Sequence, residues 1–317
     1  QNSIGSGLAP TEILGNAQHG VLLRNDAGGN RIGDTGDGAG NTIAHNGAAL
    51  GRHGHGVVVE SGTGNAIRHN LIFSNSGRGI DLVNAVKPDT FTLNDPMDND
   101  SGANGLQDYP VATSVQIVGA DQRIRWTLDS TPNTIFQIDF FANSAEDPSG
   151  FGEGERFLFS VAVATNAKGI ANIEQIFPKD DLISATATDN ITNNTSEFSM
   201  IDSDGDALAD AWERLGIDLD EDGHVDYRLP DAKPDRKDLY VEVDAMMGLA
   251  PTQANLNRVV AAFAAAPIVN PDDSTGITLH AKLDEIMPRQ PWTTDLDGDG
   301  LDGIGEDRNT NGKFDPG

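Results

Sequence analysis

Aspartate stands at alternate positions in residues 202–213, and this segment is the one best suited to chemistry. It reads DSDGDALADAWE and contains four aspartates and one glutamate. Carboxylates this close together in a short loop repel each other unless a cation lies between them. A hard cation such as Ca²⁺ takes about six to eight oxygen ligands, which alternating side chains can supply. The spacing therefore predicts a calcium-binding loop that is ordered in calcium and disordered in a chelator.

Each ligand position of an EF-hand-type calcium loop is filled in this segment. Such a loop takes oxygen ligands from its first, third, fifth, seventh, ninth and twelfth residues, the seventh through its backbone carbonyl. The sixth position usually needs glycine for a sharp turn, but here it is Ala207, so the geometry is expected to differ. The predicted ligands are Asp202, Asp204, Asp206, the Leu208 carbonyl, Asp210 and Glu213.

Three further segments repeat the alternation, each with glycine at the sixth position. The first, which begins at Asp218, has Leu229 where the twelfth-position acid is expected, so we expect it to bind more weakly or to borrow a ligand. In-register repetition favours calcium over the alternative of solvated acidic loops. The predicted ligands are Asp218, Asp220, Asp222, the His224 carbonyl and Asp226; Asp295, Asp297, Asp299, the Leu301 carbonyl and Glu306; and Asp307, Asn309, Asn311, the Lys313 carbonyl and Asp315. These tandem loops resemble thrombospondin type 3 and dockerin-like calcium repeats.

The charge of the whole chain also favours a cationic partner. Its 317 residues include 21 Lys plus Arg and 49 Asp plus Glu, which gives a formal net charge of −28. A nucleic-acid backbone would be repelled by this charge. The sequence contains no cysteine and no apolar run long enough to cross a membrane. We therefore expect calcium as a partner, and neither nucleic-acid binding nor a membrane span.

Residues 1–85 are expected to position nothing catalytic but to form a stack of short strands. GNTIAHNG at 40–47 returns as GNAIRHNL at 64–71, and HGVLLRN, HGVVVES and RGIDLVN recur with their glycines at positions 20, 56 and 79. The predicted inward residues are Val57, Val59, Ile67, Ile72, Ile80 and Leu82, and the predicted asparagine ladders at the turns contain Asn41, Asn65, Asn70 and Asn75. This pattern resembles the right-handed parallel β-helix repeats of secreted bacterial surface proteins and polysaccharide-active enzymes.

Two further regions lie between these repeats and the acidic loops. Residues 86–110 are polar, rich in Asn, Asp, Gly and Pro, and are predicted to be a linker. Residues 111–201 contain seven short runs of alternating apolar and polar residues separated by turns, the last of them within 195–201. This pattern predicts an antiparallel immunoglobulin-like β-sandwich.

Residues 231–290 are expected to begin a small α/β domain. The pattern predicts a strand at 237–247, a helix at 251–267 and a strand at 275–285. The stretch ADAWERLGIDLDEDGHVDYRLPDAKPDRKDLYVEVDAM, with the helix and TGITLHAKLD after it, resembles the amino-terminal part of a family of secreted bacterial zinc-metalloprotease-like proteins. That resemblance implies an HExxH zinc site further along the chain. This sequence contains no HExxH, so no catalytic residue is carried over.

Together the patterns predict a mainly β, multidomain chain. The expected function is that of a calcium-binding extracellular or cell-surface structural or adhesive module of a larger bacterial protein, with a cell-surface glycan or polysaccharide as a further partner. Two alternatives remain open: the non-catalytic amino-terminal part of a secreted zinc metalloprotease, and a polysaccharide-active β-helix protein. The expected regions are a partial parallel β-helix (1–85), a linker (86–110), a β-sandwich (111–201), calcium loops (202–230), a strand–helix–strand element (231–290) and calcium loops (291–317).

Overall fold

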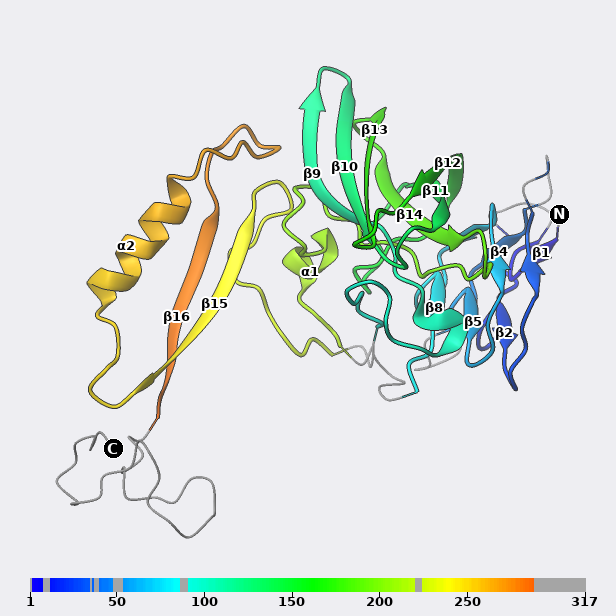
Figure 1. The fold of residues 1–317 in the computed structure, drawn as a ribbon, viewed down its shortest axis with the longest axis horizontal. Helices are drawn as coiled ribbons and strands as arrows, with labels where there is room; N and C mark the ends of the chain where they lie inside the picture. Colours follow the sequence, from blue (N-terminus) through cyan, green and yellow to red (C-terminus); the bar gives the residue numbers. More distant parts are fainter. Residues whose placement is uncertain are drawn as a thin grey trace, which may run out of the picture. The chain divides into compact units, whose positions relative to one another are not determined.

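The computed structural model describes residues 2–7, 12–34, 36, 40–47, 54–85, 91–219 and 224–287. Within them the fold is mainly β, built from several small sheets (Figure 1). The chain divides into two compact units. The first comprises Gln1–Asp238 and Pro267–Gly276, and the second comprises Leu239–Ala266 and Ile277–Gly317.

The first unit begins with three small parallel sheets that the chain visits in rotation. Their orders are β1-β4-β7, β2-β5-β8 and β3-β6, and each strand pairs in parallel with the strand formed one circuit earlier. The strands are β1 (Ser3–Ile4), β2 (Val21–Leu23), β3 (Arg31–Ile32), β4 (Thr42–Ala44), β5 (Val57–Val59), β6 (Ala66–Ile67), β7 (Leu71–Phe73) and β8 (Ile80–Leu82).

The register differs in one place from the sequence repeat. Residues 40–47 do not lie on 64–71: β4 pairs with β7, with Ile43 opposite Ile72, whereas β6 lies in another sheet beside β3. The similar stretches belong to different sheets because the circuits differ in length. The glycine-led triplets do stack as predicted, with Val21 opposite Val57 and Val57 opposite Ile80.

Three ladders of asparagine side chains run along the edges of these circuits. Asn2, Asn41 and Asn70 form one, Asn16, Asn46 and Asn75 form the second, and Asn30, Asn65 and Asn104 form the third. Between most rungs an amide Nδ2 donates to the next Oδ1 at 2.8–3.0 Å. The predicted asparagines are therefore in ladders, and the six predicted inward residues are all buried.

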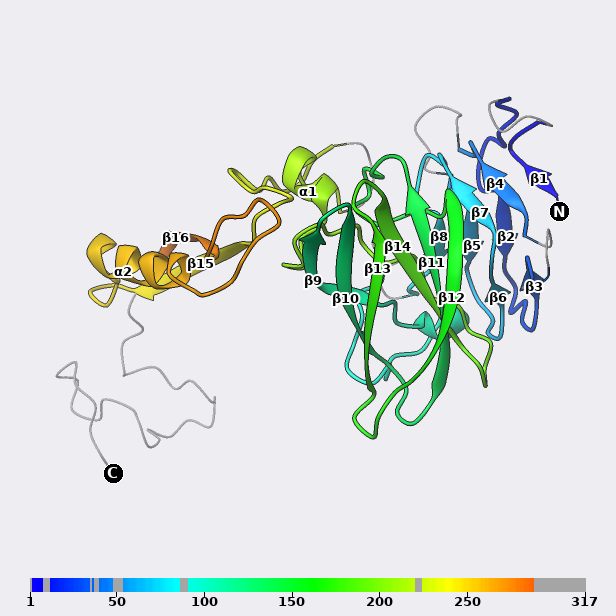
Figure 2. The ribbon, with the colours of Figure 1, turned by 90° about the horizontal axis from the view of Figure 1, so that it is seen from above.

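Two three-stranded antiparallel sheets follow (Figure 2). Their strands contribute buried aromatic side chains to one shared core. One sheet contains β9 (Val111–Val118), β10 (Asp121–Asp129) and β13 (Ile170–Pro178); the other contains β11 (Ile135–Asn143), β12 (Arg156–Ala164) and β14 (Leu182–Asp189). Trp126, Phe136 and Phe140 are fully buried in this core because alternate residues of each strand face inward.

The seventh predicted strand, within 195–201, is not a regular strand. The segment runs beside β14, but the hydroxyls of Ser196 and Ser199 accept hydrogen bonds from the amides of Ala187 and Ala185, each at 2.9 Å. Side-chain oxygens thus replace two of the backbone carbonyls that a ladder would use, and only isolated bridges remain.

The segment predicted as a linker is packed into the first unit. Ala103 and Leu106, in a short 3-10 helix (Ala103–Leu106), join the core of the parallel sheets. Tyr109 packs in a separate cluster with Phe151 and Trp212. Residues 91–110 therefore contribute buried side chains to two cores of this unit.

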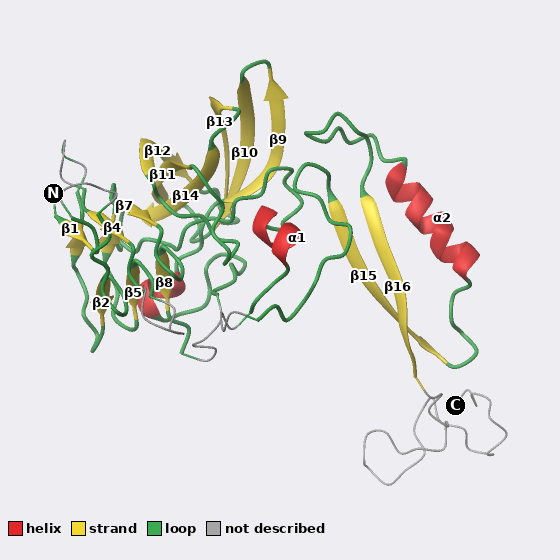
Figure 3. Cartoon of the chain, turned by 180° about the vertical axis from the view of Figure 1, so that it is seen from behind, coloured by secondary structure: helices red, strands yellow, loops and turns green. Residues whose placement is uncertain are grey.

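The second unit has the predicted strand–helix–strand order, shown in Figure 3. It contains β15 (Asp238–Met246) except for its first residue, Asp238, which belongs to the first unit, together with α2 (Gln253–Ala264) and β16 (Thr278–Met287). β15 is hydrogen-bonded to β16. Tyr240 stacks on His280 near the start of both strands, and the Met247 amide donates to the Met287 carbonyl at their ends. The strands therefore run in the same direction. No helix in the described part of the chain has the length and hydrophobicity needed to cross a bilayer.

Candidate metal centre

The loop 202–209 leads into the short helix α1 (Asp210–Leu215) in the first unit. Packing fixes the helix: Trp212 lies in the cluster with Tyr109 and Phe151, and its Nε1 donates to the Ser149 carbonyl at 2.8 Å. Because Trp212 is fixed, its neighbour Glu213 is held beside the aspartates of the preceding loop.

Asp202 fixes the shape of the loop itself. Its carboxylate accepts hydrogen bonds from the amides of Gly205 at 2.6 Å and Ala207 at 2.9 Å. Ala207 has φ +75°, the left-handed conformation that glycine adopts more easily. The sequence departs from the usual glycine at this position, yet the backbone keeps the conformation for which glycine is normally chosen.

Five carboxylates converge around the loop. Oxygen atoms of Asp202, Asp204 and Asp206 lie within 4.8 Å of one another, and so do oxygen atoms of Asp206, Glu213 and Asp238. Asp206 belongs to both groups, and it accepts a hydrogen bond from the Asp238 amide at 2.6 Å. The loop, the helix and Asp238, all in the first unit, thus contribute to two groups of three carboxylates that share Asp206.

The other two predicted ligands of this loop have supporting contacts. Asp210 accepts from the amide and the hydroxyl of Ser203 at 2.8 and 2.5 Å, one bond at each carboxylate oxygen. The Leu208 amide donates to Asp206 at 2.8 Å. Asp210 therefore braces the loop in this structure, and it is not among the converging groups.

Asp204 is the residue whose environment is most unusual. It is 1% exposed, and neither of its carboxylate oxygens has a hydrogen-bond partner among the described residues. Within the same residues, Oε1 of Glu213 is also buried without a partner. Burying an ionised carboxylate without a compensating charge or hydrogen bond is strongly unfavourable. A cation bound here would supply the missing partner for both side chains.

Burial and mutual repulsion act on every carboxylate of the loop. Burial, with the neighbouring acids added, raises the pKa of Asp204 to about 9 and the pKa of Glu213 to about 10. Burial also raises the pKa of Asp206 and that of Asp210 to about 6, and it raises the pKa of Asp202. Without a cation, the folded loop at neutral pH therefore holds protons that the unfolded chain has already released near pH 4.

The donor set selects a class of ion. Within the described residues, the groups of three or more side chains that could hold a metal consist of carboxylates alone, with neither histidine nor cysteine. Zinc sites usually contain nitrogen or sulfur ligands, whereas calcium and magnesium take oxygen. The loop can therefore hold a hard divalent cation.

The other predicted loops are described only in small part. Asp218, His224 and Asp226 are placed, and Asp226 accepts from the Leu219 amide at 2.8 Å, but no metal-binding group was found among these described residues. Outside the described residues lie Asp220, Asp222, Asp295, Asp297, Asp299, Leu301, Glu306, Asp307, Asn309, Asn311, Lys313 and Asp315.

Asp238 is the member of these carboxylate groups that the sequence pattern missed. It lies 25 residues after Glu213 and was expected only as part of a strand. The loop spacing contains no signal for it, because folding alone brings the start of β15 to the loop. Two more carboxylate groups were also missed: Asp95, Asp98 and Asp108 in the predicted linker, and the exposed Glu242, Asp244 and Asp284 in the second unit.

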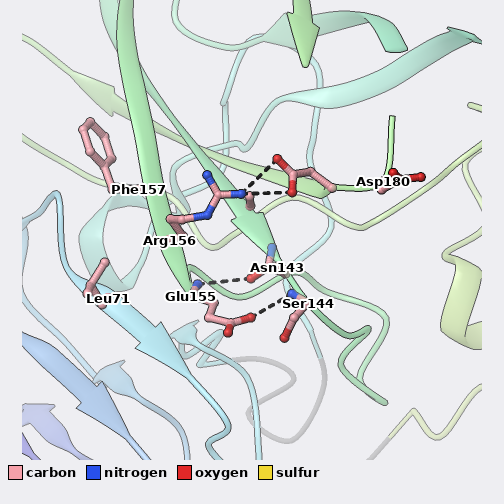
Figure 4. Close-up of a pocket in the computed structure, with 9 residues that line it drawn as sticks. Leu71, Asn143, Ser144, Glu155, Arg156, Phe157 and Asp180 are labelled. Atoms are coloured by element: carbon pink, nitrogen blue, oxygen red, sulfur yellow. Dashed lines mark hydrogen bonds and ion pairs between the residues drawn. The ribbon is translucent and has the colours of Figure 1, made fainter. Parts of the chain in front are cut away.

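The hollow shown in Figure 4 is a different kind of feature. It has a volume of about 590 Å³ and lies between β11, β12 and β7. Its polar groups already bind one another: Arg156 donates to both Asp181 oxygens at 2.9 Å, and Glu155 accepts from the Ser144 amide at 2.7 Å. Because these polar groups already bind one another, the hollow does not indicate a particular class of ligand.

Comparison with known proteins assigns no function to the chain. No protein-family model matches the sequence, and a search of curated proteins found no match. The chemistry of the carboxylate centre is therefore the basis for a functional assignment.

Proposed function

We propose that this chain is a calcium-dependent structural or adhesive module of a larger bacterial protein that works outside the cell or at its surface. The observation that carries this proposal is Asp204, a fully buried carboxylate inside a group of acids, neither of whose oxygens has a hydrogen-bond partner among the described residues. A bound cation would connect the loop, α1 and the start of β15, which are otherwise held together against charge repulsion.

Calcium fits this centre better than magnesium does. Five carboxylates from three segments can meet calcium's demand for about six to eight oxygens, with water or carbonyls completing the set. Magnesium requires near-octahedral geometry and usually keeps several waters, with only one or two carboxylates. Calcium is also abundant outside cells, so this preference supports the proposed location.

The folds of the first unit support a structural role. Parallel sheets visited in rotation, with asparagine ladders at their edges, support assignment of residues 1–85 to a parallel β-helix. Two facing antiparallel sheets support an immunoglobulin-like sandwich in 111–201. Such modules present extended surfaces, and we propose a cell-surface glycan as the ligand of that surface. Binding of the full chain to immobilised polysaccharides tests this part, and the absence of any binding would contradict it.

Thermal unfolding of the full chain tests the calcium assignment. Melts in calcium, in magnesium and in a chelator should show a rise in melting temperature of several degrees with calcium and a smaller one with magnesium. Asp204→Asn should lose most of this calcium-dependent rise, whereas Asp121→Asn, an exposed acid at the start of β10, should keep it. Equal melting temperatures in calcium and chelator would contradict the proposal.

A further inference from the structure

A second buried group of carboxylates lies in the segment that the sequence predicted to be a linker. Oxygen atoms of Asp95, Asp98 and Asp108 lie within 4.8 Å of one another. Asp108 is only 2% exposed; its Oδ1 accepts from the Asp95 amide at 3.2 Å, but its Oδ2 has no hydrogen-bond partner among the described residues. In the same part of the chain, Oδ1 of Asp98 and Oδ1 of Asp100 are also buried without a partner.

A network of hydrogen bonds holds the group in place. Gln107 donates through Nε2 to the Ser130 hydroxyl at 2.8 Å, and that hydroxyl donates to Oδ2 of Asp98 at 2.9 Å. The Met97 amide donates to Asp129, the last residue of β10, at 3.0 Å. Asp98 is therefore fixed by contacts with the sandwich, and its other oxygen is left for a ligand.

The electrostatics of the group resemble those of the loop at 202–213. Burial, with the charge of Asp98 added, raises the pKa of Asp108 to about 9. Burial also raises the pKa of Asp98 to about 6, against the lowering effect of its hydrogen bond from Ser130. Asp95 is partnered, since its Oδ1 accepts from the Asn99 amide at 2.8 Å. Among the described residues, Asp98 and Asp108 each keep one buried oxygen without a hydrogen-bond partner, and these oxygens need either a proton or a cation.

We propose that Asp95, Asp98 and Asp108 form a second site for a hard divalent cation, with Asp100 close enough in sequence to assist. The three side chains provide oxygen ligands only, as calcium requires. This site shares no residue with the carboxylate centre of the loop and goes beyond the function proposed for it.

A cation at this site would fix the segment that links the two folds of the first unit. Asn104, at the end of the third asparagine ladder, accepts from the Asn65 amide at 2.9 Å and donates to the Thr195 carbonyl at 2.8 Å. Tyr109 follows Asp108 directly and packs against Phe151. Ordering Asp95–Asp108 therefore orders contacts to both the parallel sheets and the sandwich.

The number of bound calcium ions in the full chain tests the proposal. After equilibrium dialysis at saturating calcium, Asp108→Asn should bind one calcium ion fewer than the unaltered chain. Asp204→Asn should lose a different ion, and the double variant should lose both. Asp121→Asn should retain the full number. Because the two sites are counted separately, failure of the site at Asp204 would be distinguishable from failure of this one.

Melting temperatures give a second readout, because Asp108→Asn should affect stability in opposite directions in a chelator and in calcium. In a chelator Asp108→Asn should melt at the same temperature or higher, since the buried amide needs no proton on folding; in calcium it should melt several degrees lower than the unaltered chain. Asp98→Asn should give the same pattern and serves if Asp108→Asn does not fold. An unchanged calcium number in the variant that folds, or an equal shift in calcium and chelator, would overturn the proposal.

Discussion

The asparagine ladders and the aspartate loop both bury closely spaced polar side chains, but these side chains are satisfied in opposite ways. Asn46 is 1% exposed, as is Asp204. Each asparagine both donates and accepts, so one rung satisfies the next: the Asn46 Nδ2 donates to Asn75 and its Oδ1 accepts from Asn16. An ionised aspartate only accepts. A row of amides is therefore complete in itself, whereas a group of carboxylates needs a cation from solution.

The largest effect is expected where an acid is placed in a ladder. Asn46→Asp removes the donor to Asn75 and puts a carboxylate at a fully buried position. We expect a loss of about 3–5 kcal/mol in the free energy of unfolding, measured by urea denaturation, with no recovery in calcium.

The control for this change is Asn2→Asp, in the same kind of ladder but with an exposed side chain. It should cost less than about 1 kcal/mol. If both variants lost a similar amount of unfolding free energy, burial of Asn46 would not explain the cost of Asn46→Asp.

The reverse change, Asp204→Asn, should act with opposite sign in the two conditions. In a chelator near neutral pH it removes a buried carboxyl that must take up a proton on folding, which should stabilise the chain by about 1–3 kcal/mol. In calcium it removes a ligand, and the affinity measured by calorimetric titration should fall by a factor of about 10–100. A variant that is less stable in both conditions would contradict the account of the loop.

The raised pKa values predict a dependence on pH that calcium should remove. In a chelator, the unfolded chain releases the protons of Asp204 and Glu213 near pH 4, but the folded chain keeps them until pH reaches about 9 to 10. The stability from these two groups is therefore complete below pH 4 and decreases as pH rises toward these values. Melting temperatures at pH 5, 7 and 9 should fall in a chelator and stay nearly level in calcium. A rise with pH in the chelator would contradict this sign.

The smallest effect is expected for Lys237, a positively charged side chain beside the loop. Lys237 donates to the Asp204 carbonyl, and its charge lowers the pKa of Asp204 against the larger effect of burial. Lys237→Met should lower stability in a chelator by less than about 1 kcal/mol. In calcium, titration should show binding that is unchanged or up to about twofold tighter. A large loss of calcium affinity would show that Lys237 orders the loop.

Local patterns in the sequence were sufficient for most strands and for the ladders. Alternating apolar residues predicted β9 to β14 and β15, because a strand in a half-buried sheet must alternate. The strand predicted within 195–201 did not form as a regular strand because the hydroxyls of Ser196 and Ser199 replace backbone acceptors, which alternation does not reveal.

Long-range placement could not be predicted from the same patterns. The similarity of 40–47 to 64–71 suggested that these two stretches stack on each other. The circuits differ in length, however, so β4 pairs with β7 and β6 pairs with β3. Asp238 was missed because its approach to Asp206 depends on tertiary folding. The cluster at Asp108 was missed because residues 86–110, polar and without periodicity, were predicted to be a linker, whereas Asp108 and most residues of 103–110 are buried.

The most direct test of the central claim is a crystal structure of the full chain grown in calcium, with anomalous scattering recorded. The account predicts an anomalous peak among Asp202, Asp204, Asp206, Glu213 and Asp238, with oxygen ligands at about 2.3–2.6 Å. No peak at this position, with Asp204 still buried and unpartnered in saturating calcium, would contradict it.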